Sequence, residues 1–177
     1  MIDVLFINPG NSKSTYQDLS KKYSAIEPPT WSLLLAESCR SINYKCEILD
    51  VNAEQISFEN VYDRIKTSSP RYLCFVVYGQ NVNAGTTSMS GAVALSEFLK
   101  KKKIELPIIF VGSHVQALPI ESLNKEKSID VVLTNEGVYA LRNILGMKSF
   151  NQDNLKKIKG IGFRYNNIAI LTEAEKI

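Results

Sequence analysis

The stretch YLCFVV at residues 72–77 contains no charged or amide side chain. A strand that is apolar at every position is buried on both faces, which is typical of an inner strand of a parallel sheet. The runs VLFI at residues 4–7 and IIFV at residues 108–111 have the same character. These three runs therefore predict three inner strands.

A fourth run, YKCEIL at residues 44–49, alternates apolar and charged side chains. Alternation predicts a strand with one buried face, as at the edge of a sheet. With a fifth run at residues 129–133, the pattern favours the flavodoxin-like order 2-1-3-4-5, because the Rossmann order would place residues 72–77 outside. We therefore expect an α/β three-layer sandwich around a five-stranded parallel sheet.

Segments with the helical spacing of apolar residues separate these runs. They lie at residues 30–42, 57–68, 88–103, 119–126 and 137–145. We expect Thr30 to cap the first segment, Thr86 or Thr87 to cap the third, and Pro119 to lie in the first turn of the fourth. Alternation of strands and helices places helices on both faces of a parallel sheet.

The last part of the sequence has a different pattern. A polar connector is followed by two β-rich runs, residues 161–165 and 168–172, which meet at Asn166-Asn167. Two asparagines between such runs are typical of a two-residue hairpin turn. We therefore divide the chain into an α/β domain, residues 1–147, and a connector with a β-hairpin appended to the sheet, residues 148–177.

Composition restricts the class of partner. The 177 residues contain 21 Lys and Arg against 18 Asp and Glu, a net charge of +3 that does not favour nucleic acid. No run is long enough to cross a bilayer. Cys39, Cys46 and Cys74 are widely spaced and lie in apolar segments, which indicates free thiols in a reducing, cytoplasmic environment. Without a CxxC pair, we expect no zinc site or iron–sulfur cluster from this chain alone.

In sheets of this kind, ligands bind beyond the carboxyl ends of the strands. Glycines there allow close approach of the backbone to a ligand, and amides suit a neutral, amide-bearing ligand. The candidates are Asn8 and Pro9 after the first strand, Tyr78, Gly79, Gln80 and Asn81 after the third, Gly112, Ser113 and His114 after the fourth, and Asn135, Glu136 and Gly137 after the fifth. Helix capping explains Asn135 equally well, and His114 taken alone is more typical of a polar turn residue.

Seven sequence fragments, taken in their order along the chain, resemble those of a known family. VLFINPG, EPPTWSLLLAESCR, YKCEILDVNA, VVYGQNVNAGTT, IIFVGSHVQALP, DVVLTNEGVYALRNIL and IKGIGFRYNN follow one another over nearly the whole chain. Together they resemble the cobalamin-binding amino-terminal domain of cobalamin-dependent radical S-adenosylmethionine enzymes. The resemblance implies a flavodoxin-like sheet with the corrin ring across its carboxyl edge. It also implies that the nucleotide tail lies near Gly79, Gly112 and Ser113, and that His114 hydrogen-bonds the tail or a side amide.

The sequence departs from related cobalamin domains in two ways. Where better-known domains carry Asp-x-His-x-x-Gly, this chain has Asn11-Ser12-Lys13, so that loop offers no histidine ligand to cobalt. The family's CxxxCxxC motif is also absent. We therefore expect a non-catalytic cofactor domain. The resemblance implies that a parent enzyme would hold the 4Fe-4S cluster and S-adenosylmethionine and would transfer a methyl group or perform another radical reaction.

Two other functions stay open. A flavin mononucleotide site in the same crevice would use backbone donors in a loop such as NSKST, residues 11–15. A cofactor-free interaction module is the other alternative. A phosphoreceiver is disfavoured, because Asn8-Pro9 and Tyr78-Gly79 stand where acidic residues are needed. Neither nucleic acid nor a membrane is expected as a partner.

Overall fold

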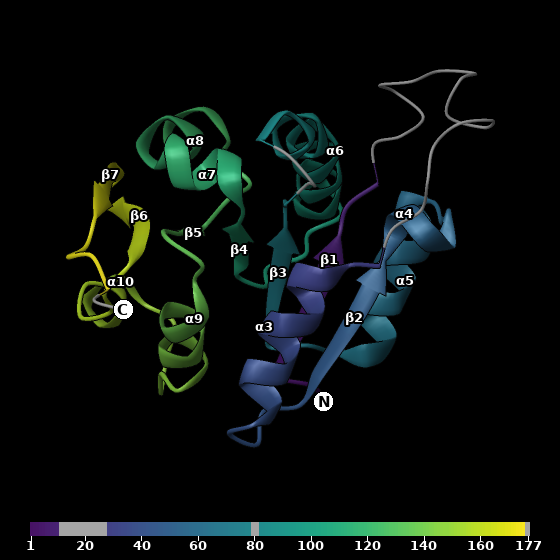
Figure 1. Ribbon diagram of the computed structural model, residues 1–177, viewed down its shortest axis with the longest axis horizontal. Coiled ribbons are helices and arrows are strands. Elements are labelled where there is room, and N and C mark those ends of the chain that lie inside the picture. The colour runs from purple at the N-terminus through teal and green to yellow at the C-terminus, as the bar shows by residue number, and fades with distance from the viewer. Residues whose placement is uncertain (11–27, 79–81, 176–177) are drawn as a thin grey trace.

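A computed structural model describes residues 1–10, 28–78 and 82–175, with only the backbone described at 82–87. The described residues form one sheet with the strand order β2-β1-β3-β4-β5-β6-β7, seen from right to left in Figure 1. Its strands are β1 (Val4–Asn8), β2 (Cys46–Asp50), β3 (Tyr72–Val76), β4 (Ile108–Val111), β5 (Val131–Leu133), β6 (Ile161–Tyr165) and β7 (Ile168–Leu171). The order of the first five strands is therefore the predicted 2-1-3-4-5.

The parallel part of the sheet follows the apolar pattern closely. β1 pairs with β2 and β3, β3 with β4, and β4 with β5, all in parallel. All residues of β3 and β4 are buried, whereas β2 has one buried residue, Leu49, and its other four positions are partly buried or exposed. The alternating run was thus correctly placed at the edge. Because these strands run in one direction, their carboxyl ends meet at one rim of the sheet.

The hairpin of β6 and β7 extends the same sheet rather than packing on it as an appendage. β6 pairs antiparallel with β5 through Leu133 and Ile161, and β7 pairs antiparallel with β6. Asn166 and Asn167 have φ values of 50° and 65°, as the predicted two-residue turn requires. Within the described ranges, the sheet consequently has seven strands instead of five.

Helices cover both faces of the sheet and make it a three-layer sandwich. They are α3 (Thr30–Arg40), α4 (Val51–Glu54), α5 (Phe58–Ser68), α6 (Val82–Lys101), α7 (Ser113–Ala117), α8 (Pro119–Lys125), α9 (Val138–Leu145) and α10 (Gln152–Leu155). One buried cluster joins α3, α9 and α10 to the sheet, and a second joins α5, α6, α7 and α8 to its other face. In Figure 1, α3 and α9 lie below the strands, and α6, α7 and α8 lie above them.

Several helix boundaries differ from those predicted. α3 has Pro29 at its N-cap position without a side-chain cap, and the Thr30 hydroxyl donates to the carbonyl of Pro28 instead. α6 begins at Val82, so Thr86 and Thr87 lie within the helix rather than before it. The short helices α4, α7 and α10 were not predicted. Pro119 does occupy the first turn of α8.

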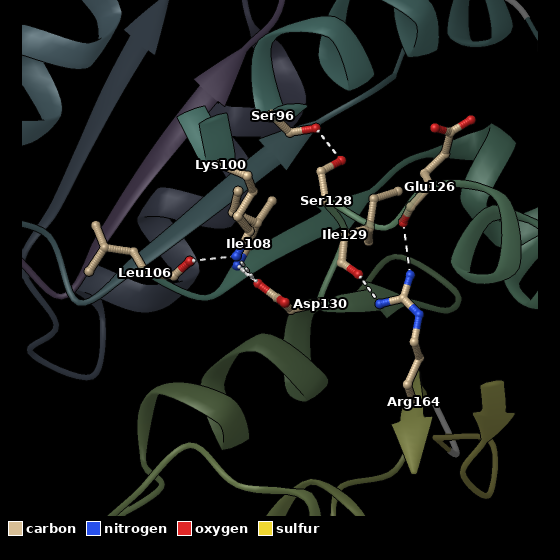
Figure 2. A network of polar contacts seen from close by, with 9 residues as sticks. All are labelled: Ser96, Lys100, Leu106, Ile108, Glu126, Ser128, Ile129, Asp130 and Arg164. Carbon is tan, nitrogen blue, oxygen red and sulfur yellow. Dashed lines mark hydrogen bonds and ion pairs between the residues drawn. The ribbon is translucent and has the colours of Figure 1, made fainter. Parts of the chain in front are cut away.

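A polar network joins α6, β4 and β5 at the amino edge of the sheet (Figure 2). Asp130 accepts hydrogen bonds from the backbone N–H of Ile108 at 2.8 Å and from Lys100 Nζ at 2.9 Å. The buried hydroxyls of Ser96 and Ser128 are 2.8 Å apart. These bonds fix the starts of β4 and β5, which lie opposite the rim formed by the carboxyl ends.

Arg164 connects the hairpin to the rest of the domain. Its guanidinium donates to the backbone carbonyls of Ile129 at 2.6 Å and Glu126 at 2.8 Å, as Figure 2 shows, and also to that of Leu123. These carbonyls belong to the end of α8 and the segment before β5. Because partial burial opposes the charge, the pKa of Arg164 is lowered.

The three cysteines are free thiols, as predicted. Among the described residues, no helix is both long and apolar enough to span a membrane.

Candidate functional site

The carboxyl ends of β3 and β4 are joined by a backbone contact at Gly112. Gly112 is buried and has φ 152° and ψ 169°. A Cβ atom at this position would lie 2.1 Å from the carbonyl oxygen of Val77, a distance that no side chain tolerates. Val77 N–H in turn donates to the carbonyl of Val111 at 2.7 Å. The residue after β4 thus lies directly beside the residue that precedes Tyr78.

The loop after β5 packs against the same place. Gly137 has φ 72°, and a Cβ atom there would lie 2.7 Å from Leu133 Cδ1 and 3.2 Å from Val111 Cγ2. Asn135 also has a positive φ, 54°. The N-cap position of α9 is Gly137, without a side-chain cap, so Asn135 does not cap the helix as expected. Asn135 is half-buried and Glu136 is exposed.

Tyr78 lies at the centre of the rim. Its ring stacks on that of Trp31 with centroids 4.4 Å apart and an angle of 23° between the planes. Burial and the nearby carboxylate of Glu136 raise the pKa of Tyr78 to about 12, with a smaller contribution from Cys74. The first turn of α3, the end of β3 and the loop after β5 therefore meet here.

Two buried hydroxyls at this end of the molecule have no hydrogen-bond partner within the described part of the chain. They belong to Tyr78 and to Ser32, whose side chain is buried beside Trp31 in the first turn of α3. Buried polar atoms are nearly always paired in folded proteins, and exceptions occur at functional sites. A ligand rich in hydrogen-bonding groups suits such a place.

The loop after β1 begins with polar contacts to the second strand. Asn8 Nδ2 donates to Asp50 Oδ1 at 2.9 Å, and the same oxygen caps α4 by accepting from the N–H of Ala53. A Cβ atom on Gly10 would lie 3.1 Å from Asn52 Cα. Pro9 between them is buried. Asn8 is therefore held at the rim by Asp50.

Ser113 and His114 belong to the first turn of α7 and not to an irregular turn. Both are half-buried, and they follow the Gly112 contact directly. The helix continues because the N–H of Gln116 donates to the carbonyl of Gly112 and that of Leu118 donates to the carbonyl of His114, both at 3.0 Å. Gly79, Gln80 and Asn81 lie outside the described residues.

Trp31, Ser32 and Asp50 were not among the sequence-based candidates. Trp31 had been read only as an apolar position of its helix. Its place at the rim follows from topology, because a helix that follows a parallel strand begins at the carboxyl edge. Asp50 is the last residue of the second strand, and an acidic residue at that position was the sequence signal that could have identified it as a site residue. In the described ranges, no group of three or more His, Cys, Asp or Glu side chains is arranged to hold a metal ion.

The B12 binding domain family model matches residues 17–145, which is most of the chain. The chain belongs to the B12 binding domain family. The matched residues include α3, Tyr78, Gly112 and the loop after β5, and hence most of the rim described above. A comparison with curated proteins finds no match.

Solved structures resemble this B12 binding domain over nearly its whole length. The radical S-adenosylmethionine methyltransferase TsrM from Kitasatospora setae, with tryptophan and a SAM analogue bound, aligns with a TM-score of 0.70 and 14% identity over 98% of this chain. TsrM with cobalamin and a [4Fe-4S] cluster gives a TM-score of 0.68 and 14% identity over 98% of the chain. The apo form of the cobalamin-dependent S-adenosylmethionine radical enzyme OxsB gives 0.60 and 14% over the whole chain.

The alignment covers only part of each of these enzymes. The chain spans 30%, 29% and 23% of the three structures in turn. At such low identity the likeness establishes the flavodoxin-like fold, and the aligned region includes the hairpin. It does not establish that this chain has the activity of the longer enzymes.

Proposed function

We propose that this domain binds cobalamin at the rim formed by the carboxyl ends of β1, β3, β4 and β5. The observation that carries the proposal is that the segments after β3, β4 and β5 converge at Tyr78. Gly112 lies against Val77, and Gly137 lies close to Val111. The carboxylate of Glu136 helps to raise the pKa of the Tyr78 hydroxyl. Membership of the B12 binding domain family supports it.

The residues at this rim fit a large, flat ligand that carries many amides. Because Gly112 and Gly137 have no side chain, the loops after β4 and β5 lie directly against Val77, Val111 and Leu133, which brings the ends of the strands together at one rim. The half-buried side chains of Ser113, His114 and Asn135 offer donors and acceptors at its margin. The hydroxyls of Ser32 and Tyr78, which have no partner in the described part of the chain, lie at the same rim.

We assign His114 a hydrogen-bonding role toward the cofactor's tail or a side amide. The loop at Asn11-Ser12-Lys13 offers no imidazole, and a protonated lysine has no lone pair for a metal. Cobalamin, when bound, supplies a cobalt-centred carrier for an alkyl group. The contribution of this chain is to hold the corrin and its tail in place.

We further propose that the domain serves a radical S-adenosylmethionine methyltransferase-like enzyme. Support comes from the two TsrM structures and OxsB, because the whole chain aligns with less than a third of each. In this proposal the cluster and S-adenosylmethionine belong to a catalytic domain, toward which residues 148–177 lead. A cytoplasmic location, predicted from the cysteines, is part of the same proposal.

Reconstitution with hydroxocobalamin tests cofactor binding. The protein should keep the corrin absorbance through gel filtration in a ratio near one cofactor per chain. Flavin mononucleotide, added in a parallel sample, should separate from the protein and leave no flavin fluorescence. Colourless protein from the first sample, or retained flavin in the second, would contradict the proposal. Light scattering then distinguishes a cofactor-free module, because a fixed multimer that ignores cobalamin would favour that alternative.

A further inference from the structure

Two cysteines lie near each other at the end of the molecule opposite the proposed cofactor site. Cys39 lies in the last turn of α3 and is 1% exposed, and Cys46 is the first residue of β2 and is half-buried. Cys39 belongs to the apolar cluster under α3, and Cys46 packs against that cluster. Their side chains therefore occupy the same interface between α3 and the sheet edge.

The short connection between α3 and β2 keeps the pair together. Within residues 41–45, the N–H groups of Ile42 and Tyr44 both donate to the carbonyl of Cys39 at 3.2 Å. Arg40 Nη2 donates to the carbonyl of Cys46 at 3.0 Å. These bonds tie the end of the helix to the start of the strand, so the cysteines are held close without any other element.

The two thiols also interact directly. The neighbouring Cys39 side chain is the largest influence on Cys46 and lowers the pKa of Cys46, with a further contribution from Arg40 against the effect of burial. Cys46 Sγ itself donates to the carbonyl of Tyr44 at 3.6 Å. The interaction with Cys46, together with burial, raises the pKa of Cys39. Cys46 is thus the thiol that reaches solvent and ionises more readily, which are the properties of a reactive cysteine.

Cys74 provides the contrast within the same protein. It lies in the interior of β3, fully buried, and burial raises its pKa. It pairs across the sheet with Phe6, whereas Cys46 pairs with Val4 on the other side of β1. A buried, protonated thiol of this kind is inert.

We propose that Cys39 and Cys46 form a reversible disulfide when the protein meets a low-molecular-weight disulfide such as glutathione disulfide. The Cys46 thiolate attacks one sulfur of the oxidant, whose S–S bond breaks and releases the first glutathione. Cys39 then loses its proton and attacks the Cys46 sulfur, which releases the second glutathione. Two electrons and two protons pass from the cysteines to the oxidant, and a reductant such as a dithiol reverses the reaction.

Formation of the mixed disulfide also favours the second step. The pKa of Cys39 is raised first by its interaction with the Cys46 side chain, then by burial, and then by negative charge on Cys46. Once Cys46 carries glutathione, that charge is gone, so Cys39 ionises more easily than before. The new bond joins the two sulfurs at about 2.05 Å.

Trypsin provides a direct test, because it cleaves after Arg40 and Lys45. The full chain is reduced, incubated with glutathione disulfide, alkylated and digested without reductant. We expect mass spectrometry to find the peptides 23–40 and 46–64 linked, and to find them separate after reduction. Cys74, in the peptide 72–100, should be alkylated once the chain is unfolded. A stable glutathione adduct on Cys46 without the link, or a link from Cys46 to peptide 72–100, would overturn the proposal.

Single substitutions separate the two roles. Cys39→Ser should leave Cys46 as a lasting glutathione adduct, Cys46→Ser should leave Cys39 reduced, and the control Cys74→Ser should give the link in unchanged yield. Alkylation rates of the wild-type protein give a readout that needs no variant: iodoacetamide at pH 7 should modify Cys46 at least about tenfold faster than Cys39 or Cys74. Equal rates for Cys46 and Cys74, or an equal yield of the link in urea, would contradict a site built by the fold.

Discussion

A Cβ atom on Gly112 would lie 2.1 Å from the carbonyl oxygen of Val77 and 2.5 Å from its carbonyl carbon. The start of α7 and the end of β3 therefore touch backbone to backbone, and Tyr78 begins the next segment from this contact. The backbone of Gly112, at φ 152° and ψ 169°, lies in a region that is essentially restricted to glycine. Both the fold and the proposed cofactor site depend on this contact.

Replacement of Gly112 tests that dependence. Gly112→Ala should lower the free energy of unfolding by at least about 1–3 kcal/mol, because the backbone conformation is strained and the methyl group meets the Val77 carbonyl. Urea unfolding measures the loss. Gly146→Ala is the matched control, since Gly146 has φ −78° and a Cβ atom there would lie 3.3 Å from its nearest neighbour, Tyr44 Oη. Equal stability of the two variants would show that the contact does not constrain the rim.

At Tyr78, in contrast, we expect a substitution to stabilise the protein, because the hydroxyl has no partner among the described residues. Tyr78→Phe keeps the ring stacked on Trp31 and removes a buried oxygen that has no partner in the described ranges, so the cofactor-free protein should become more stable, by up to about 1–3 kcal/mol. Thermal unfolding measures the change. Tyr139→Phe, at a side chain that is 54% exposed, should have no effect. A destabilised Tyr78→Phe variant would mean that the hydroxyl has a partner.

Tyr78 should also make the stability of the protein depend on pH in the alkaline range. The pKa of Tyr78 is about 12 in the folded chain, against 10.0 for the ordinary side chain. The unfolded chain therefore loses this proton first, and the contribution of Tyr78 is complete below pH 10 and lost as the pH rises toward 12. Other buried groups titrate in this range too, so the decisive quantity is the difference between wild type and Tyr78→Phe. A difference that stays constant from pH 9 to 12 would refute the shift.

We expect the hydrogen bonds of Arg164 to hold the hairpin of β6 and β7 against the rest of the domain. Arg164→Met removes donors from the carbonyls of Leu123, Glu126 and Ile129 and should cost about 1.5–3 kcal/mol of stability. Hydrogen exchange should also become faster in β6 and β7. Arg64→Met, at an exposed position of α5, is the matched control and should change neither quantity. Unchanged exchange in Arg164→Met would show that strand pairing alone holds the hairpin.

The strand order was predictable because burial on one face or on two leaves a distinct pattern. YLCFVV has no charged residue, whereas YKCEIL has charged residues at its second and fourth positions, and that difference predicted β3 inside and β2 at the edge. The hairpin turn was equally readable from Asn166-Asn167. Its pairing with β5 was not, because antiparallel extension of a parallel sheet leaves no local mark in the sequence.

The site was only partly predictable. The loops at Gly112 and Gly137 followed from their position after strands, but the stacking of Trp31 on Tyr78 required the three-dimensional placement of α3. The short helix α7 was read as a turn because Pro119 follows it closely and five residues carry too little periodicity. Asn135 looked like a helix cap, yet Gly137 takes that position through its own positive φ.

Hydrogen exchange of the backbone amides with and without hydroxocobalamin tests the central claim most directly. If cobalamin binds at the rim, the cofactor should slow exchange at residues 8, 10, 78, 112–114 and 135–137, and leave residues 161–171 in the hairpin unchanged. Uniform exchange in both samples, or protection confined to the hairpin or to the amino edge near Asp130, would contradict the account.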